Sequence, residues 1–254
     1  MSTQYESVQV ATLYPEAFNV AAPTTPVGRN VWPRQAGVFI RRLATQAADD
    51  AQAEGVKDAE SVESAEDVQD SPGAAADKAP VICELVAGQM GLVPRWVKSA
   101  SDAKLRSTKL ATARSEMVTT SNNFRDAWLN GQRCIVPMVA FVEDDWRSGK
   151  AVPTRITRVD GKPMGVAGLW ERWTGADGEV IISFTLLTVN ANSHALMHRY
   201  QQPGNEKRMP VVLNEGAFDA WLSARPEKAR EFMRAYPANW LTANPVEKSK
   251  SGKA

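Results

Sequence analysis

The chain has 254 residues and a mass of 27.7 kDa, which suits one domain of ordinary size or one domain with an insert. Hydrophobic residues make up 43%, enough for a core, yet no apolar run approaches the roughly 18 residues that a membrane helix needs. The only cysteines are Cys83 and Cys134, and the only histidines are His194 and His198. This inventory argues against a disulfide framework and a histidine-rich metal site, so we expect no metal and no cofactor. No signal-peptide pattern opens the chain, and we expect a cytoplasmic protein.

The net charge of +1 conceals an uneven distribution. Residues 43–80 sum to −8, so the remainder of the chain carries +9. The acidic stretch has no aromatic residue and cannot bury enough apolar area to offset its ordering entropy. We therefore expect a single domain over residues 1–245, an acidic disordered insert over 44–80 within it, and a flexible tail over 246–254. The basic remainder would attract polyanions, although a merely soluble basic surface explains the charge equally well.

In chain order, residues 36–43 and 80–87 predict two strands that form a long hairpin around the insert. Residues 88–96 then read as a turn-rich loop. An amphipathic pattern predicts a short helix over 124–131, and the β-branched, apolar run that follows predicts a buried strand over 133–143.

Further strands are predicted over residues 154–157, 164–173, 179–190 and 209–213, and helices over 191–199, 217–223 and 226–236. An Asp177-Gly178 pair marks a hairpin turn before the third of these strands. Many strands with few intervening helices favour an α+β fold, a mixed barrel-like core of mainly antiparallel strands, over a doubly wound sheet.

Common catalytic motifs are absent from the sequence, including phosphate-binding glycine loops and the G-x-S-x-G elbow. His194 and His198 are four residues apart on a predicted helix, where they face either one site or solvent. Several of the eight tryptophans adjoin arginine or lysine, a pattern that suits stacking on single-stranded bases and is equally found in cores.

One ordered series of short motifs is specific. It consists of Gly91-Leu-Val-Pro-Arg-Trp96, Ala113-Arg-Ser-Glu116, Phe124-x3-Trp128, Arg133-Cys-Ile-Val-Pro137, Ala140-Phe-Val-Glu143, Ser148-Gly-Lys-Ala-Val152, Ala167-Gly-Leu-Trp170-x2-Trp173, Ser183-Phe-Thr185, Ala191-Asn192, Arg208-Met-Pro210 and Trp221-Leu222. This order resembles the SRAP family, the SOS response-associated peptidases that sense abasic sites in single-stranded DNA. The resemblance covers roughly residues 1–42 and 81–224.

The resemblance implies a mixed β-barrel-like fold with a positively charged groove for single-stranded DNA. In that family Met1 is removed, and the next residue is a cysteine whose amine and thiol capture the ring-opened sugar of an abasic site as a thiazolidine. An Asn and an Arg hold the lesion and its phosphate, while a Glu and a His handle protons. Cross-linking, lyase and peptidase-like, self-processing (hydrolase) activities are implied with them.

This chain departs from the family pattern at key positions. Ser2 stands where the cysteine is expected, and Thr112 replaces the Asn, whereas Arg114, Glu116 and Glu143 are retained. The segment that carries the family histidine is longer here. Its register leaves open whether His194, His198 or Gln201 takes that position.

Carried over residue by residue, the resemblance assigns catalysis to Ser2, Glu143 and His198, and DNA contacts to Arg95, Trp96, Thr112, Arg114 and Arg208. The α-amine of Ser2 suffices to form a Schiff base with an aldehyde, with Glu143 as the retained base. A hydroxyl closes the ring poorly, so no durable thiazolidine is expected. The alternative is a non-catalytic single-stranded DNA-binding or regulatory paralogue. In either case we expect a monomer with no membrane contact.

Overall fold

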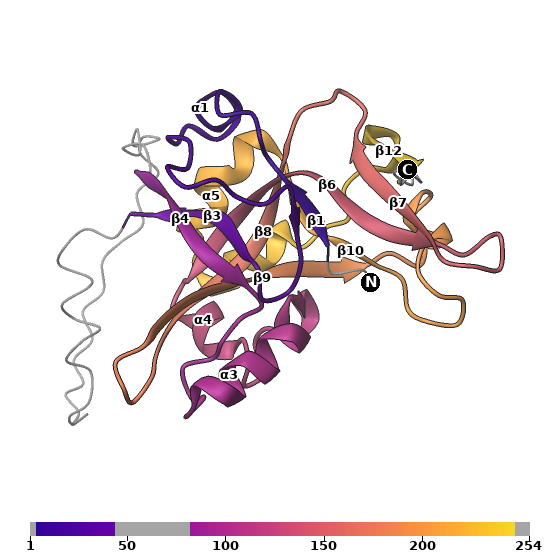
Figure 1. Ribbon diagram of the computed structural model, residues 1–254. Coiled ribbons are helices and arrows are strands. Elements are labelled where there is room, and N and C mark those ends of the chain that lie inside the picture. Colours follow the sequence, from indigo (N-terminus) through magenta and orange to yellow (C-terminus); the bar gives the residue numbers. More distant parts are fainter. Residues whose placement is uncertain (1–3, 44–81, 247–254) are drawn as a thin grey trace, which may run out of the picture.

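The computed structural model describes residues 4–43 and 82–246, and their strands join into one sheet (Figure 1). Its centre is a closed barrel of five strands in the order β8 (Met164–Thr174), β9 (Val180–Asn190), β4 (Cys83–Met90), β3 (Ala36–Arg42) and β6 (Arg133–Asp145). The circuit closes because β6 also pairs with β8. One pair, β4 with β9, is parallel, so the barrel is mixed. The predicted α+β, barrel-like architecture is confirmed.

Shorter strands extend the barrel at its margins. They are β1 (Tyr5–Ser7), β2 (Asn30–Val31), β5 (Thr112–Arg114), β7 (Val152–Arg158), β10 (Arg208–Pro210), β11 (Val212–Leu213) and β12 (Leu241–Pro245). β5 and β10 both pair with β9, β5 in parallel and β10 antiparallel. β1 joins β6, and β7 connects β6 to β12.

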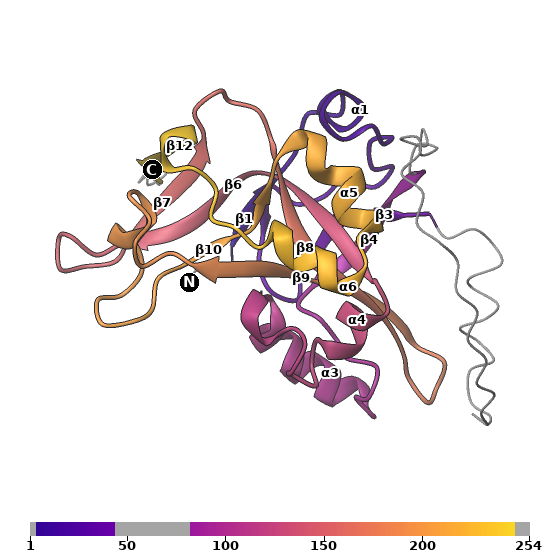
Figure 2. The ribbon, with the colours of Figure 1, turned by 180° about the vertical axis from the view of Figure 1, so that it is seen from behind.

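The helices are short and lie outside the barrel: α1 (Leu13–Phe18), α3 (Ala100–Ser107), α4 (Arg125–Leu129), α5 (Phe218–Ser223) and α6 (Pro226–Ala229). In both views α3 and α4 lie on the side of the barrel away from α1 and α5 (Figures 1 and 2). None of the helices in the described part of the chain has the length and apolarity needed to cross a bilayer.

Aromatic side chains fill the barrel. The rings of Phe39 and Phe184 lie 5.6 Å apart, and both residues are fully buried beside Tyr5. Gly37 is required where β3 passes this cluster, because a Cβ there would collide with the Tyr5 hydroxyl and lie 2.9 Å from the Phe184 ring. Burial of these rings supplies much of the hydrophobic free energy that closes the sheet.

Three predicted elements are shortened or divided in the structure. The helix expected over 191–199 is reduced to one 3-10 turn, Met197–Arg199, because side chains of Asn190 and His194 take backbone amides that a helix would use. The strand expected over 209–213 divides into two at Val211, whose backbone bonds both β9 and β8. The last predicted helix ends at Ala229 and continues only as a 3-10 turn.

The strand before the insert and the strand after it pair in register from Ala36↔Gln89 to Arg42↔Cys83, which confirms the long hairpin. Its second strand runs on to Met90, into the predicted loop. The predicted insert over 44–80, Ser2, and residues 247–254 of the predicted tail lie outside the described residues.

Candidate functional site

Glu143 lies near the end of β6 and is 1% exposed. Side chains alternate along a strand, so Glu143 shares the face of Phe141, which pairs with Tyr5 in the aromatic core. Next to it, the Val142 amide donates to the Gln4 carbonyl at 3.1 Å. The structure therefore brings Gln4, two residues after the predicted nucleophile Ser2 and just before β1, to the strand end that carries the predicted base.

Gln201 lies against the same strand end. Its amide donates to the Asp144 carbonyl at 2.8 Å, and its backbone adopts a left-handed φ of 69°. The side chain is buried and bonds both backbone groups of Arg208, with Nε2 to the carbonyl at 2.6 Å and Oε1 to the amide at 3.1 Å. The Gln201 backbone thus contacts the residue next to Glu143, and its side-chain amide group fixes the start of β10.

The two histidines have different environments. His198 is exposed, and its Nδ1 donates to the His194 carbonyl at 2.8 Å. The His194 Nδ1 accepts the Met197 amide at 3.0 Å, so its Nε2 carries the proton that it donates to the Tyr236 carbonyl at 2.7 Å. His194 therefore closes a local turn and ties the C-terminal segment to it.

Arg208 is 5% exposed and fully occupied by partners. Its Nη1 and Nη2 bond the two oxygens of Glu116 at 2.6 and 2.9 Å, and Nη2 also bonds the Thr188 carbonyl at 2.8 Å. These hydrogen bonds from Arg208 hold the pKa of Glu116 below its usual value. The guanidinium of this predicted DNA contact thus joins the 3-10 turn after β5 to β9 and β10.

β5 carries the retained Arg114 and, at its start, Thr112 in place of the family Asn. Thr112 and Arg114 pair with β9 in parallel register, and the Arg114 side chain is 58% exposed. Its Nη1 lies 2.9 Å from an oxygen of Glu206, a residue that sequence reasoning missed. Glu206 follows a stretch of polar residues in the lengthened segment, which resembled an ordinary solvent loop.

Arg95 and Trp96 lie apart from this cluster, at the opposite end of β9 and close to α3. The Arg95 Nε donates to Glu171 at 2.6 Å. Burial dominates at that carboxyl and raises the pKa of Glu171 despite the arginine. The Trp96 indole is 41% exposed and lies 4.5 Å from the Arg106 guanidinium, a partly open aromatic surface.

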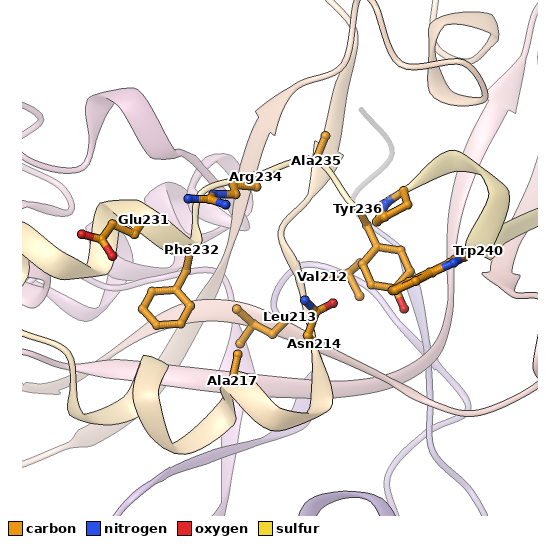
Figure 3. Close-up of a pocket in the computed structure, with 11 residues that line it drawn as sticks. Val212, Leu213, Asn214, Ala217, Glu231, Phe232, Arg234, Ala235, Tyr236 and Trp240 are labelled. Carbon is orange, nitrogen blue, oxygen red and sulfur yellow. The ribbon is translucent and has the colours of Figure 1, made fainter. Parts of the chain in front are cut away.

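A cavity of about 460 Å³ lies between β11 and the segment after α6 (Figure 3). Phe232, Arg234, Tyr236 and Trp240 form part of its wall, and none of the predicted site residues does. Residues 4–43 and 82–246 hold no group of three His, Cys, Asp or Glu side chains arranged to bind a metal.

Known proteins share both the sequence and the fold. A family model described as SOS response associated peptidase (SRAP) matches residues 3–250. Abasic site processing protein YoqW of Bacillus subtilis is 29% identical over 61% of this chain and 66% of its own length. Abasic site processing protein HMCES of Gallus gallus is 25% identical over 61% of this chain and 50% of its own length. The matched part thus spans one half to just under two thirds of these relatives.

A crystal structure of a Bordetella bronchiseptica protein superposes with a TM-score of 0.77 and 36% identity, covering 96% of this chain and 99% of that one. A Bacteroides thetaiotaomicron structure at 24% identity shares the fold over 65% of this chain, with a TM-score of 0.59. The family model, the ordered motifs and the mixed barrel agree, and the chain belongs to the SRAP family.

Proposed function

We propose that this protein binds single-stranded DNA at abasic sites in the DNA damage response and attacks the lesion aldehyde with the α-amine of Ser2. The pairing of Gln4 with Val142 carries this proposal, since it brings the start of β1 to the strand end of buried Glu143. Because only Thr3 separates Ser2 from Gln4, chain connectivity supports a Ser2 amine near Glu143. The printed names of the relatives, abasic site processing proteins, support the lesion.

The proposed chemistry begins after removal of Met1. The neutral amine of Ser2 adds to the C1′ aldehyde of the ring-opened sugar, water leaves, and an imine forms. The imine acidifies the C2′ hydrogen, and the Glu143 carboxylate accepts that proton. The electron pair then expels the 3′ phosphate, so the C3′–O bond breaks and the strand is cleaved by β-elimination.

A serine at position 2, in place of cysteine, changes the last step of the proposed reaction. A thiol at this position would add to the imine and close a five-membered thiazolidine, whereas an alcohol of ordinary pKa is a far weaker nucleophile. We therefore propose a transient imine and no durable cross-link. His198 stays a proposed proton-transfer residue, and Arg95, Trp96, Thr112, Arg114 and Arg208 stay proposed DNA contacts for a monomer in the cytoplasm.

One observation favours the alternative, a non-catalytic DNA-binding or regulatory paralogue. The backbone of Gln201, a residue with no titratable group, bonds the Glu143 strand at Asp144, while the His198 ring is exposed and bonded to the His194 carbonyl. In this arrangement neither Gln201 nor His198 is placed to act as an acid for the leaving group, whereas the basic surface for binding is kept.

Trapping with borohydride separates the two functions, because only an imine is reduced to a stable link. The untagged protein is incubated with labelled single-stranded DNA that carries one abasic site, with and without borohydride, and resolved on a denaturing gel. Mass spectrometry of the same sample establishes whether Met1 has been removed. A borohydride-dependent adduct that is lost when the amine is blocked supports the enzyme, and DNA binding without an adduct or cleavage supports the paralogue.

A further inference from the structure

Four charged side chains converge at the end of β9, with which both β5 and β10 pair. Arg114 and Arg208 supply two positive charges, and Glu116 and Glu206 supply two negative ones. Glu206 accepts from the Arg208 Nη1 at 2.9 Å through Oε1 and lies 2.9 Å from the Arg114 Nη1 through Oε2. The cluster is therefore electrically neutral at rest, although it contains the arginine that the family resemblance assigns to the phosphate.

Glu206 has a third donor. The Asn190 Nδ2, at the end of β9, reaches its Oε1 at 2.7 Å. Two guanidinium groups and one amide that converge on a carboxylate form a donor set that equally suits a phosphate. The hydrogen bonds from Asn190 and Arg208 lower the pKa of Glu206, so the carboxylate is ionised at neutral pH.

The donors and the acceptor differ in how firmly their backbones are held. Arg114, Asn190 and Arg208 belong to paired strands, and the Arg208 side chain is 6% exposed. Glu206 follows an exposed turn in which the Asn205 amide bonds the Gln202 carbonyl, and its side chain is 29% exposed. Rotation of the Glu206 side chain alone therefore uncovers the donors while the sheet stays in place.

We propose that Arg114, Asn190 and Arg208 form a phosphodiester subsite whose internal occupant is the Glu206 carboxylate, which a backbone phosphate of single-stranded DNA must displace. This inference rests on the proposed function. Because displacement exchanges one anion for another, Glu206 weakens DNA binding at this subsite and makes the protein selective for DNA that is also held elsewhere.

The test measures binding of a fluorescent single-stranded oligonucleotide to the full chain at several salt concentrations. Glu206→Gln removes the competing charge, and Glu84→Gln is the matched control. Glu84 is a similarly half-buried carboxylate paired with Arg41 at 2.7 Å at the start of β4, remote from β10 (Figure 1). A double variant, Arg114→Gln with Glu206→Gln, shows whether any increase in DNA affinity depends on Arg114.

Glu206→Gln is expected to tighten binding by about 5- to 15-fold near 0.1 M salt, the effect of removing one like charge at about 5 Å from the bound phosphate. The slope of log K against log salt is expected to steepen by about 0.7, one further phosphate contact. Glu84→Gln should leave affinity nearly unchanged, and the gain should disappear in the Arg114→Gln background.

Two results overturn the inference while the proposed function stands: wild-type protein that binds while Glu206→Gln binds equally or more weakly, or equal gains in both glutamine variants. Failure of both the wild type and Glu206→Gln to bind overturns the proposed function and the inference together. Thermal melts of each variant verify that binding is measured on folded protein.

Discussion

The backbone amide of Val142 donates to the carbonyl of Gln4 at 3.1 Å, and the next residue of β6 is Glu143, which is 1% exposed. This pairing fixes Gln4, near the N-terminal end of the described chain, beside the strand end that carries Glu143. The register from Tyr5↔Phe141 to Ser7↔Met138, with a shift between Glu6 and Ser7, maintains it.

Replacing Ser2 by Cys is expected to convert a transient imine into a durable adduct. A thiol on the same residue adds to the imine and closes the thiazolidine ring, and thiols react far faster than alcohols at neutral pH. The adduct of Ser2→Cys with abasic single-stranded DNA should survive a denaturing gel without borohydride. If Ser2→Cys forms no such adduct while it still binds DNA, the amine does not reach the lesion.

The ion pair between Glu6 and Arg155 predicts an acid-dependent stability. Burial alone would raise the pKa of Glu6, but hydrogen bonds and charge from Arg155, with Nη2 at 2.9 Å, lower it overall. A carboxyl whose folded pKa is depressed stabilises the fold above its unfolded pKa, and that contribution is lost as pH falls through the folded value.

Urea unfolding between pH 7 and pH 3 tests this. Glu6→Gln should lose about 1 to 2 kcal/mol at pH 7, and this difference from the wild type should shrink as the pH falls below about 4. A difference that stays constant over this range would show that the pair contributes no pH-dependent stability.

Replacement of His194 and replacement of His198 are expected to affect the stability of the protein differently. His194→Ala removes the bond to the Tyr236 carbonyl at 2.7 Å and uncaps Met197, a loss of about 2 kcal/mol. Faster amide exchange in residues 230–240 is the expected signature. His198→Ala should leave exchange in that segment unchanged, since the side chain is exposed. Equal effects from both substitutions would contradict the assignment of His194 as a structural residue.

Arg133 is a buried cation whose Nε and Nη2 find no hydrogen-bond partner among the residues that the structure describes. Its guanidinium lies 5.6 Å from the ring of Trp128 and 5.7 Å from the ring of Trp221. Burial lowers the pKa of Arg133 to about 10. Two unpartnered buried donors cost about 1 to 3 kcal/mol each, more than the two ring contacts return at about 1 kcal/mol each.

Arg133→Met keeps the volume and removes the charge, so the free energy of unfolding should stay equal or rise by about 1 kcal/mol. Arg133→Ala, which leaves a cavity, should lose about 2 kcal/mol or more. Chemical denaturation measures the free energy of unfolding of both variants, and equal m-values show that the two values can be compared. A loss above about 2 kcal/mol in Arg133→Met would show that the charge itself stabilises the fold.

The long strands could be predicted because their sequences carry the signal. The apolar, β-branched runs of β6 and β9 specify buried strands wherever they occur. β1, β5 and β12 were not predicted, since three to five residues are too few to show alternation. Their strand character comes from partners far along the chain, such as Leu186 to Thr188 for β5.

In the candidate site, too, some residues could be predicted from local sequence and others depend on distant partners. Glu143 and Arg114 could be proposed from local motifs, but the ion pair that joins Glu116 to Arg208 spans 92 residues and depends on the barrel. Glu206 could not be anticipated, because a glutamate in a polar loop has no distinguishing pattern until Arg114, Asn190 and Arg208 surround it. The structure also distinguished Gln201, beside the Glu143 strand, from the exposed His198.

The most direct test of the account is borohydride trapping of the wild-type protein on single-stranded DNA with one abasic site. We expect a covalent adduct only when borohydride is present, and we expect it to be lost when the Ser2 amine is blocked. Without borohydride we expect strand cleavage, which Glu143→Gln suppresses. An adduct that persists without borohydride would show that the hydroxyl closes the ring after all. DNA binding with neither an adduct nor cleavage would contradict amine chemistry.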